Sequence, residues 1–126
     1  MEEKVLVQDA NEAILDVLTL ALETEGFNVM PILNCDDKIL ELVDEFRPHA
    51  VILDYRLSGD ACIEICHRIK EKYPHLPVIA LSCNINIHEH YAKAGFDAYI
   101  PKPFDLDLLY KTLRDHLPAS SVALEK

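Results

Sequence analysis

The chain has 126 residues, which is enough for one ordinary domain and too few for two. Half of these residues are hydrophobic and only three are glycine, a composition that excludes a disordered chain. The net charge of −10 at pH 7 repels nucleic acid and anionic lipid, and no apolar run is long enough to cross a membrane. We therefore expect a globular domain that binds neither nucleic acid nor membrane directly.

The first residues and the cysteines predict the compartment. The acidic start over 1–4 leads directly into an apolar run, so it lacks the pattern of a secretory signal. In an unsecreted chain the four cysteines are expected to be reduced thiols and not a disulfide framework; they are Cys35, Cys62, Cys66 and Cys83. These features predict a cytoplasmic domain.

Taken in chain order, short apolar runs alternate with amphipathic stripes. The runs are predicted to be strands over 4–8, 27–32, 50–54, 77–82 and 97–100. Each is followed by apolar residues at helical spacing, over 14–22, 39–46, 62–73, 87–94 and 106–117. Asn11 or Asp9 is a candidate N-cap of the first helix, and Asp105 of the last. This alternation predicts a five-stranded parallel sheet with helices on both faces, the flavodoxin-like doubly wound α/β class.

The strand order follows from two of the runs. Four unbroken apolar residues precede Asp54, which predicts a strand that is buried on both faces. Pro31 lies within the second run, and because proline removes a ladder donor, that strand is expected at an edge of the sheet. The edge position favours the order 2-1-3-4-5, in which the first and third strands are neighbours and the winding reverses between them. The crevice at this reversal is predicted to hold Asp9 and Asp54.

Four side chains are expected to meet at the carboxyl edge of this sheet. Asp9 and Asp54 end neighbouring strands, and two like charges at close range require either a bound proton or a cation between them. Mg²⁺ suits two carboxylates, some backbone oxygen and retained water. Ser82 ends the fourth strand and Lys102 follows the fifth, so a hydroxyl and an ammonium reach the same edge. Such a set forms a receptor for a phosphoryl group, whose negative charge needs cations and donors.

These residues lie in motifs that resemble the receiver domain of bacterial two-component response regulators. The similarity covers about residues 4–117 and depends on V-L-V-Q-D, V-I-L-D-Y, P-V-I-A-L-S, A-G-F-D-A-Y-I and P-K-P-F in this order and spacing. We expect a receiver domain over 1–118 and a polar C-terminal tail over 119–126. The resemblance implies a phosphorylation-driven signalling switch that transfers a phosphoryl group only onto itself and is not a turnover enzyme.

The resemblance also implies a role for each residue of the site. Asp54 would accept the phosphoryl group from a phosphohistidine of a histidine kinase or a histidine phosphotransfer protein. Asp9, Asp54 and the backbone carbonyl of Arg56 would ligate Mg²⁺. Lys102 would pair with a phosphoryl oxygen, and Ser82 would move to hydrogen-bond the phosphoryl group.

The family transmits this event through an aromatic switch. Tyr99 would turn inward and change the surface formed by the fourth helix, the fifth strand and the fifth helix, through which the family usually binds a downstream protein. The family further implies a cis peptide bond between Lys102 and Pro103.

The sequence departs from the family pattern at several positions. The family usually has two acidic residues after the first strand, and the first of them is replaced here by Gln8. That residue typically holds a metal-bound water, so Gln8 is a candidate ligand through water and could weaken Mg²⁺ binding. It supports one alternative, a receiver-like docking module that works without phosphorylation. Ser58 and Cys62 change loop shape more than chemistry, and Arg56 and Asn84 stand where the family tunes dephosphorylation.

The same residues allow other interpretations. Asp9 alone is as consistent with a helix cap as with a metal ligand. A flavodoxin-type flavin protein needs a glycine-rich or hydroxyl-rich phosphate loop, whereas 8–11 contains no glycine and carries an anion. A haloacid-dehalogenase-like phosphatase needs a second aspartate where Asn11 stands. Cys62 and Cys66 have no second ligand pair at zinc spacing, so they are expected to pack in the core.

Overall fold

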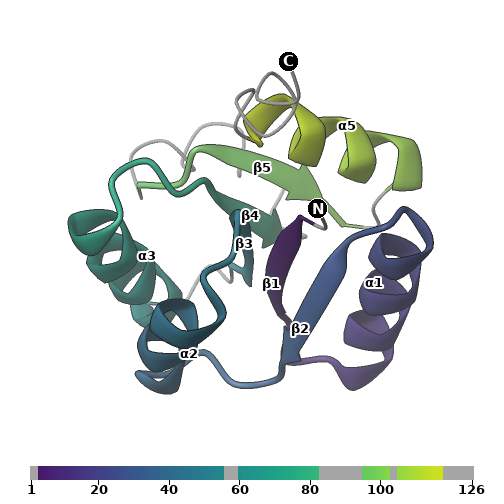
Figure 1. The fold of residues 1–126 in the computed structure, drawn as a ribbon. Coiled ribbons are helices and arrows are strands. Elements are labelled where there is room, and N and C mark those ends of the chain that lie inside the picture. The colour runs from purple at the N-terminus through teal and green to yellow at the C-terminus, as the bar shows by residue number, and fades with distance from the viewer. Residues whose placement is uncertain (1–2, 56–59, 83–94, 103–104, 118–126) are drawn as a thin grey trace, which may run out of the picture.

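The computed structural model describes residues 3–55, 60–82, 95–102 and 105–117, which form a parallel sheet between two pairs of helices (Figure 1). The strands are β1 (Lys4–Gln8), β2 (Asn28–Ile32), β3 (Ala50–Asp54), β4 (Val78–Ser82) and β5 (Ala98–Pro101). The helices are α1 (Glu12–Thr24), α2 (Lys38–Phe46), α3 (Asp60–Lys72) and α5 (Leu106–His116). The strands are ordered β2-β1-β3-β4-β5 and every neighbouring pair is parallel. The predicted fold class and strand order are confirmed.

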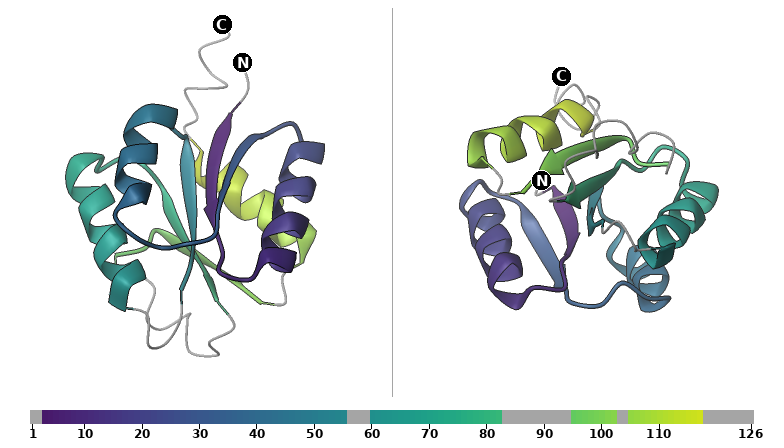
Figure 2. Two further views of the ribbon diagram at one scale, coloured as in Figure 1. Left: turned by 90° about the horizontal axis from the view of Figure 1, so that it is seen from below. Right: turned by 180° about the vertical axis from the view of Figure 1, so that it is seen from behind.

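Each face of the sheet has its own apolar core, because successive side chains of a strand point to opposite faces. On β1, Val5 and Val7 pack with α1 and α5, whereas Leu6 packs with α2 and α3. The strand β3 alternates in the same way, and all five of its residues are buried. Figure 2 shows α1 and α5 on one side of the sheet and α2 and α3 on the other. β1 and β3 are therefore held firmly at the centre, which fixes where their carboxyl ends emerge.

The strand β2 lies at an edge of the sheet, as its proline predicts. Pro31 is paired with Val7 of β1, and it is exposed. Within the described sheet, β2 has a neighbouring strand on one side only, namely β1. An edge strand of this kind tolerates a proline, which has no backbone N–H to donate to a hydrogen-bond ladder. The edge position of β2 leaves β1 and β3 as neighbours and so creates the reversal between them.

The ends of the helices follow from local chemistry. Asn11 caps α1, its side-chain oxygen accepting from the backbone N–H of Ile14 at 3.1 Å, and Asp105 caps α5. The helix α2 is followed by its C-cap, Arg47, whose φ of 55° lies in the left-handed region where glycine is usual, directly before Pro48. The observed bounds of β1 and β3 equal the predicted ones, and those of the other described elements differ from prediction by at most two residues.

Two predicted segments fall outside the described residues, namely the fourth helix over 87–94 and the tail over 119–126. The predicted boundary of the domain at residue 118 lies there as well. None of the described helices has the length and apolar character that crossing a bilayer requires.

Candidate functional site

Buried polar side chains gather at one edge of the sheet. Among the described residues, the buried polar or charged side chains are Gln8, Asp9, Asp54 and Ser82. All four stand at, or directly after, the carboxyl ends of β1, β3 and β4. Ligands of open α/β sheets bind at this edge, next to the reversal of winding that here lies between β1 and β3. The burial pattern therefore marks the same edge that the strand order marks.

Strand pairing brings two carboxylates side by side. Gln8 of β1 is paired with Leu53 of β3, so the residues that follow them, Asp9 and Asp54, leave the sheet next to each other. The backbone N–H of Asp9 donates to the carbonyl of Ile32 at 3.0 Å, which fixes the chain as it leaves β1. The exposed fraction is 0% for Asp9 and 4% for Asp54. Two buried carboxylates in this position need a compensating cation.

Lys102 supplies a positive charge to both carboxylates. Its Nζ lies 2.9 Å from Oδ2 of Asp9 and 2.9 Å from Oδ1 of Asp54. Its backbone N–H donates to the carbonyl of Ser82 at 2.8 Å, which places the lysine directly beyond β5 at the carboxyl edge. Burial disfavours the charged form of the ammonium, but hydrogen bonds to Asp9 and Asp54 outweigh it and raise the pKa of Lys102 above its ordinary value. The lysine is therefore protonated at neutral pH.

The two oxygens of Asp9 have different surroundings. Oδ1 accepts from the backbone N–H of Asn11 at 2.8 Å. Oδ2 is buried, and within the described part of the chain it accepts no hydrogen bond beyond its ion-pair contact with Lys102. A buried carboxylate oxygen with unused capacity, beside a second carboxylate, suits a hard divalent cation. The residues present thus fit Mg²⁺.

The number of side-chain ligands is small. Over the described residues, no group of three or more His, Cys, Asp or Glu side chains is arranged to hold a metal ion. Asp9 and Asp54 would be the side-chain ligands. This suits Mg²⁺ better than a cation that demands a full protein cage, because Mg²⁺ usually keeps several of its waters.

Gln8 is bound to the backbone at both ends of its amide. Its Oε1 accepts from the backbone N–H of Asp54 at 3.1 Å, and its Nε2 donates to the carbonyl of Leu33 at 2.9 Å. The side chain therefore ties the end of β3 to the segment that follows β2. Sequence reasoning missed this role because it depends on the path of that segment, for which the sequence contains no signal. The predicted contact of Gln8 with a metal-bound water stays a prediction.

The remaining predicted site residues are only partly described. Ser82 is buried at the end of β4, opposite Pro101 of β5. Tyr99 is partly buried on β5 and packs against the core on the side of α2 and α3. The structure thus brings Asp9, Asp54 and Lys102 into contact, with Ser82 at the same edge. Four further predictions lie outside the described residues. They concern the carbonyl ligand Arg56, the loop residue Ser58, the rate-tuning residue Asn84 and the cis bond before Pro103.

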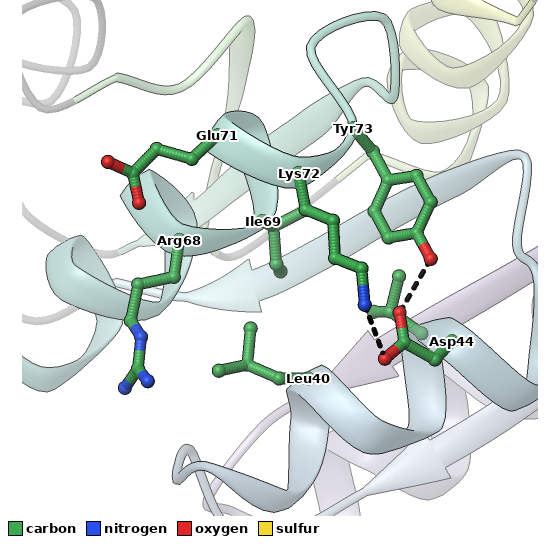
Figure 3. Close-up of a pocket in the computed structure, with 8 residues that line it drawn as sticks. Leu40, Asp44, Arg68, Ile69, Glu71, Lys72 and Tyr73 are labelled. Carbon is green, nitrogen blue, oxygen red and sulfur yellow. Dashed lines mark hydrogen bonds and ion pairs between the residues drawn. The ribbon is translucent and has the colours of Figure 1, made fainter.

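A separate pocket of about 360 Å³ lies between α2 and α3 (Figure 3). Leu40 and Ile69 contribute apolar lining, and the Asp44 carboxylate accepts from Lys72 at 2.8 Å and from the Tyr73 hydroxyl at 2.5 Å. These polar groups satisfy one another at the surface. None of the residues that line this pocket belongs to the carboxylate site, so the two are distinct.

The comparisons with known proteins agree with this geometry. A family model of the response regulator receiver domain matches residues 5–114. Response regulator MprA of Mycobacterium sp. (strain KMS) is 30% identical over 123 residues, which are 96% of this chain and 53% of that protein. The chain therefore spans about half the length of the curated relatives that it matches.

Solved structures show the same fold. The BeF3-activated DrrB receiver domain is 30% identical, with a TM-score of 0.78 over 92% of this chain and 97% of that one. Chemotaxis response regulator CheY4 of Vibrio cholerae has a TM-score of 0.81 over 93% of this chain and 100% of that one, at 21% identity. With a family model that covers most of its length, the chain belongs to the response regulator receiver domains, which act in two-component signalling.

Proposed function

We propose that Asp54 accepts a phosphoryl group from a phosphohistidine of a histidine kinase or a histidine phosphotransfer protein. The observation that carries this proposal is the contact of one ammonium, Lys102 Nζ, with Asp9 and Asp54, at 2.9 Å each, within a buried polar edge. Holding two carboxylates together away from water is costly to folding, and such arrangements concentrate at functional sites. The solved form of the DrrB receiver domain, which is activated by BeF3, supports the same reading.

Asp54 would act as the nucleophile. One of its carboxylate oxygens attacks phosphorus, a phosphorus–oxygen bond forms, and the phosphorus–nitrogen bond to the histidine breaks. Lys102 already contacts Oδ1 of Asp54 and, being protonated, would then pair with an oxygen of the phosphoryl group. Asp9 and Asp54, with the backbone carbonyl of Arg56, would hold Mg²⁺, which when bound offsets negative charge on the transferred group. Gln8, the last residue of β1, stands in place of a second acid and would weaken this metal site.

The acquired charge would be transmitted through two residues. Ser82, at the same edge, would hydrogen-bond the phosphoryl group, and Tyr99 would turn inward on β5. These changes would alter the surface made by the fourth helix, β5 and α5, to which a downstream protein would bind. The domain would transfer the group only onto itself, without turnover of a substrate. Exchange with a histidine kinase would place it in the cytoplasm.

A second function is favoured by one observation. The Gln8 amide is bound to the backbone at both ends and brings no charge to the site. A receiver-like module that docks on a partner without phosphorylation would tolerate this residue. Under this alternative, the contact of Lys102 with Asp9 and Asp54 would serve the fold alone.

Beryllofluoride with Mg²⁺ distinguishes the two functions, because it mimics the phosphoryl group without a donor. The amide resonances around Tyr99 would be followed by NMR during the titration. We expect them to shift in the wild type and to stay in place in Asp54→Asn, the matched control. No shift in the wild type, with its fold intact, would favour the docking module.

A further inference from the structure

Two cysteine side chains that the proposed function does not use lie against each other beside the site. Cys35 belongs to the segment between β2 and α2, and Cys62 to the first turn of α3, 27 residues further along the chain. Their Sγ atoms are 3.0 Å apart. A disulfide bond has a length of about 2.04 Å, so an approach of about 1 Å would join the two sulfurs.

The two thiols differ in their access to solvent. Cys35 is partly exposed, whereas Cys62 is buried in the core with Cys66. The Sγ of Cys62 lies 2.9 Å from the backbone carbonyl oxygen of Asp54, to which its S–H donates. The pair therefore combines one sulfur that a small oxidant can reach with one that contacts the proposed phosphoacceptor.

We propose that Cys35 and Cys62 form a reversible intramolecular disulfide when a hydroperoxide oxidises the protein. The Cys35 thiolate attacks one oxygen of the hydroperoxide, its oxygen–oxygen bond breaks, and an alcohol or water leaves as Cys35 becomes a sulfenic acid. Cys62 then attacks the sulfur of Cys35, the sulfur–oxygen bond breaks, and water leaves with the Cys62 proton. Two thiols lose two electrons in total and one hydroperoxide gains them. A dithiol reductant reverses the change.

The assignment of Cys35 as the attacking sulfur agrees with its surroundings. The hydrogen-bond contact with the Cys62 thiol lowers the pKa of the Cys35 thiol, against the opposing effects of burial and of the Asp36 and Asp54 charges. Among the described residues Cys66 has no such thiol partner, and burial raises its pKa to about 12. The contact with Cys35 and burial raise the pKa of Cys62 as well, so the two buried thiols differ in position: the sulfur of Cys62 lies 3.0 Å from that of Cys35, and Cys66 serves as the buried control.

The disulfide would change the site as well as the segment before α2. It removes the S–H that Cys62 donates to the carbonyl of Asp54, and it ties the segment after β2 to α3. This second part of the inference depends on the proposed function. Because a displacement of about 1 Å near reacting groups can cost up to about 10²-fold in rate, we expect the oxidised protein to be phosphorylated at least about fivefold more slowly.

The first experiment measures the bond itself. Dilute folded protein is treated with hydrogen peroxide, and its remaining thiols are alkylated in denaturant and counted by intact mass. The wild type and Cys66→Ala should each lose two alkylation sites, with a peptide map joining Cys35 to Cys62, and dithiothreitol should restore both sites. Cys35→Ser and Cys62→Ser should form no such bond, and the partly exposed Cys35 position keeps the test valid if Cys62→Ser does not fold. A wild type that keeps all four sites, or that joins other cysteines, would overturn the proposal.

The second experiment measures the coupling to Asp54. Oxidised and reduced wild type are compared in their rate of labelling by acetyl phosphate with Mg²⁺, with Cys35→Ser under the same treatments as control. Slower labelling of the oxidised wild type alone is the expected result, and equal rates would overturn the coupling. If reduced wild type is not labelled at all, the proposed function fails, while the thiol count still decides whether the disulfide forms.

Discussion

Burial, and not distance, should set how much each lysine–carboxylate contact of this domain contributes to the free energy of unfolding. Lys102 Nζ lies 2.9 Å from Asp9 and 2.9 Å from Asp54, and its side chain is 13% exposed. Lys111 Nζ lies at the same 2.9 Å from Asp115, but these two side chains are 73% and 56% exposed. Replacing either lysine by methionine removes the ammonium and keeps an apolar stem of similar length. The two substitutions therefore compare one kind of contact in two environments.

The expected magnitudes differ several-fold. At an effective dielectric constant of about 20, two unit charges 2.9 Å apart attract each other by about 6 kcal/mol. Desolvation offsets most of this attraction, and removing one partner of a buried pair costs about 3–5 kcal/mol. We expect Lys102→Met to lower the free energy of unfolding by about 3 kcal/mol, because it leaves two buried carboxylates without their cation. Lys111→Met should lower it by about 0.4 kcal/mol, the usual value for an exposed pair one helical turn apart.

Urea unfolding at pH 7 with a chelator, followed by circular dichroism, measures both values. With an m value of about 1.5 kcal/mol/M, Lys102→Met should lower the midpoint by about 2 M at unchanged m. Adding Mg²⁺ should stabilise Lys102→Met more than the wild type, since the ion would supply positive charge that the lost ammonium no longer provides to Asp9 and Asp54. Equal midpoint shifts for Lys102→Met and Lys111→Met would refute the reasoning, because they would mean that burial adds nothing to the contact.

Three further outcomes are expected. The pKa of Lys102 is raised in the folded state, so the stability that its charge gives the folded protein is complete below the unfolded pKa of about 10.4 and is lost as pH rises through the folded value. The difference in unfolding free energy between wild type and Lys102→Met should therefore stay constant from about pH 7 to 9 and shrink above about pH 10.5. Gln8→Glu removes the donor to the Leu33 carbonyl and adds a buried charge, so it should lower the free energy of unfolding by about 1–3 kcal/mol without metal. The same substitution should raise the affinity for Mg²⁺ in calorimetry, and an unchanged affinity would contradict a metal near residue 8. Asn11→Ala removes the acceptor for the Ile14 N–H and should cost about 1 kcal/mol in urea unfolding, whereas Asn11→Asp should cost little.

The sequence contains the information that places the candidate site, because that placement depends on strand order. Pro31 assigns β2 to an edge, and this assignment makes β1 and β3 neighbours. Once they are neighbours, residues 9 and 54 must emerge side by side, and Lys102, which the sequence places at the same edge, contacts both of them. All of these inferences use periodicity and proline chemistry, which act locally.

Contacts that depend on the path of irregular segments could not be predicted in this way. The segment after β2 brings the Leu33 carbonyl to the amide of Gln8, and it brings Cys35 to Cys62. No periodic pattern fixes such a path. Likewise, the left-handed conformation at Arg47 occurs at a residue type that does not favour it. The site's charges were accessible from the sequence, whereas the groups that hold them in place were not.

The central claim is that Asp54 is the phosphoacceptor, and intact mass after incubation with acetyl phosphate and Mg²⁺ tests it most directly. The wild type should gain a single phosphoryl group, and Asp54→Asn should gain none under the same conditions. An equal adduct on Asp54→Asn, or none on a folded wild type that also fails to bind beryllofluoride, would contradict the account.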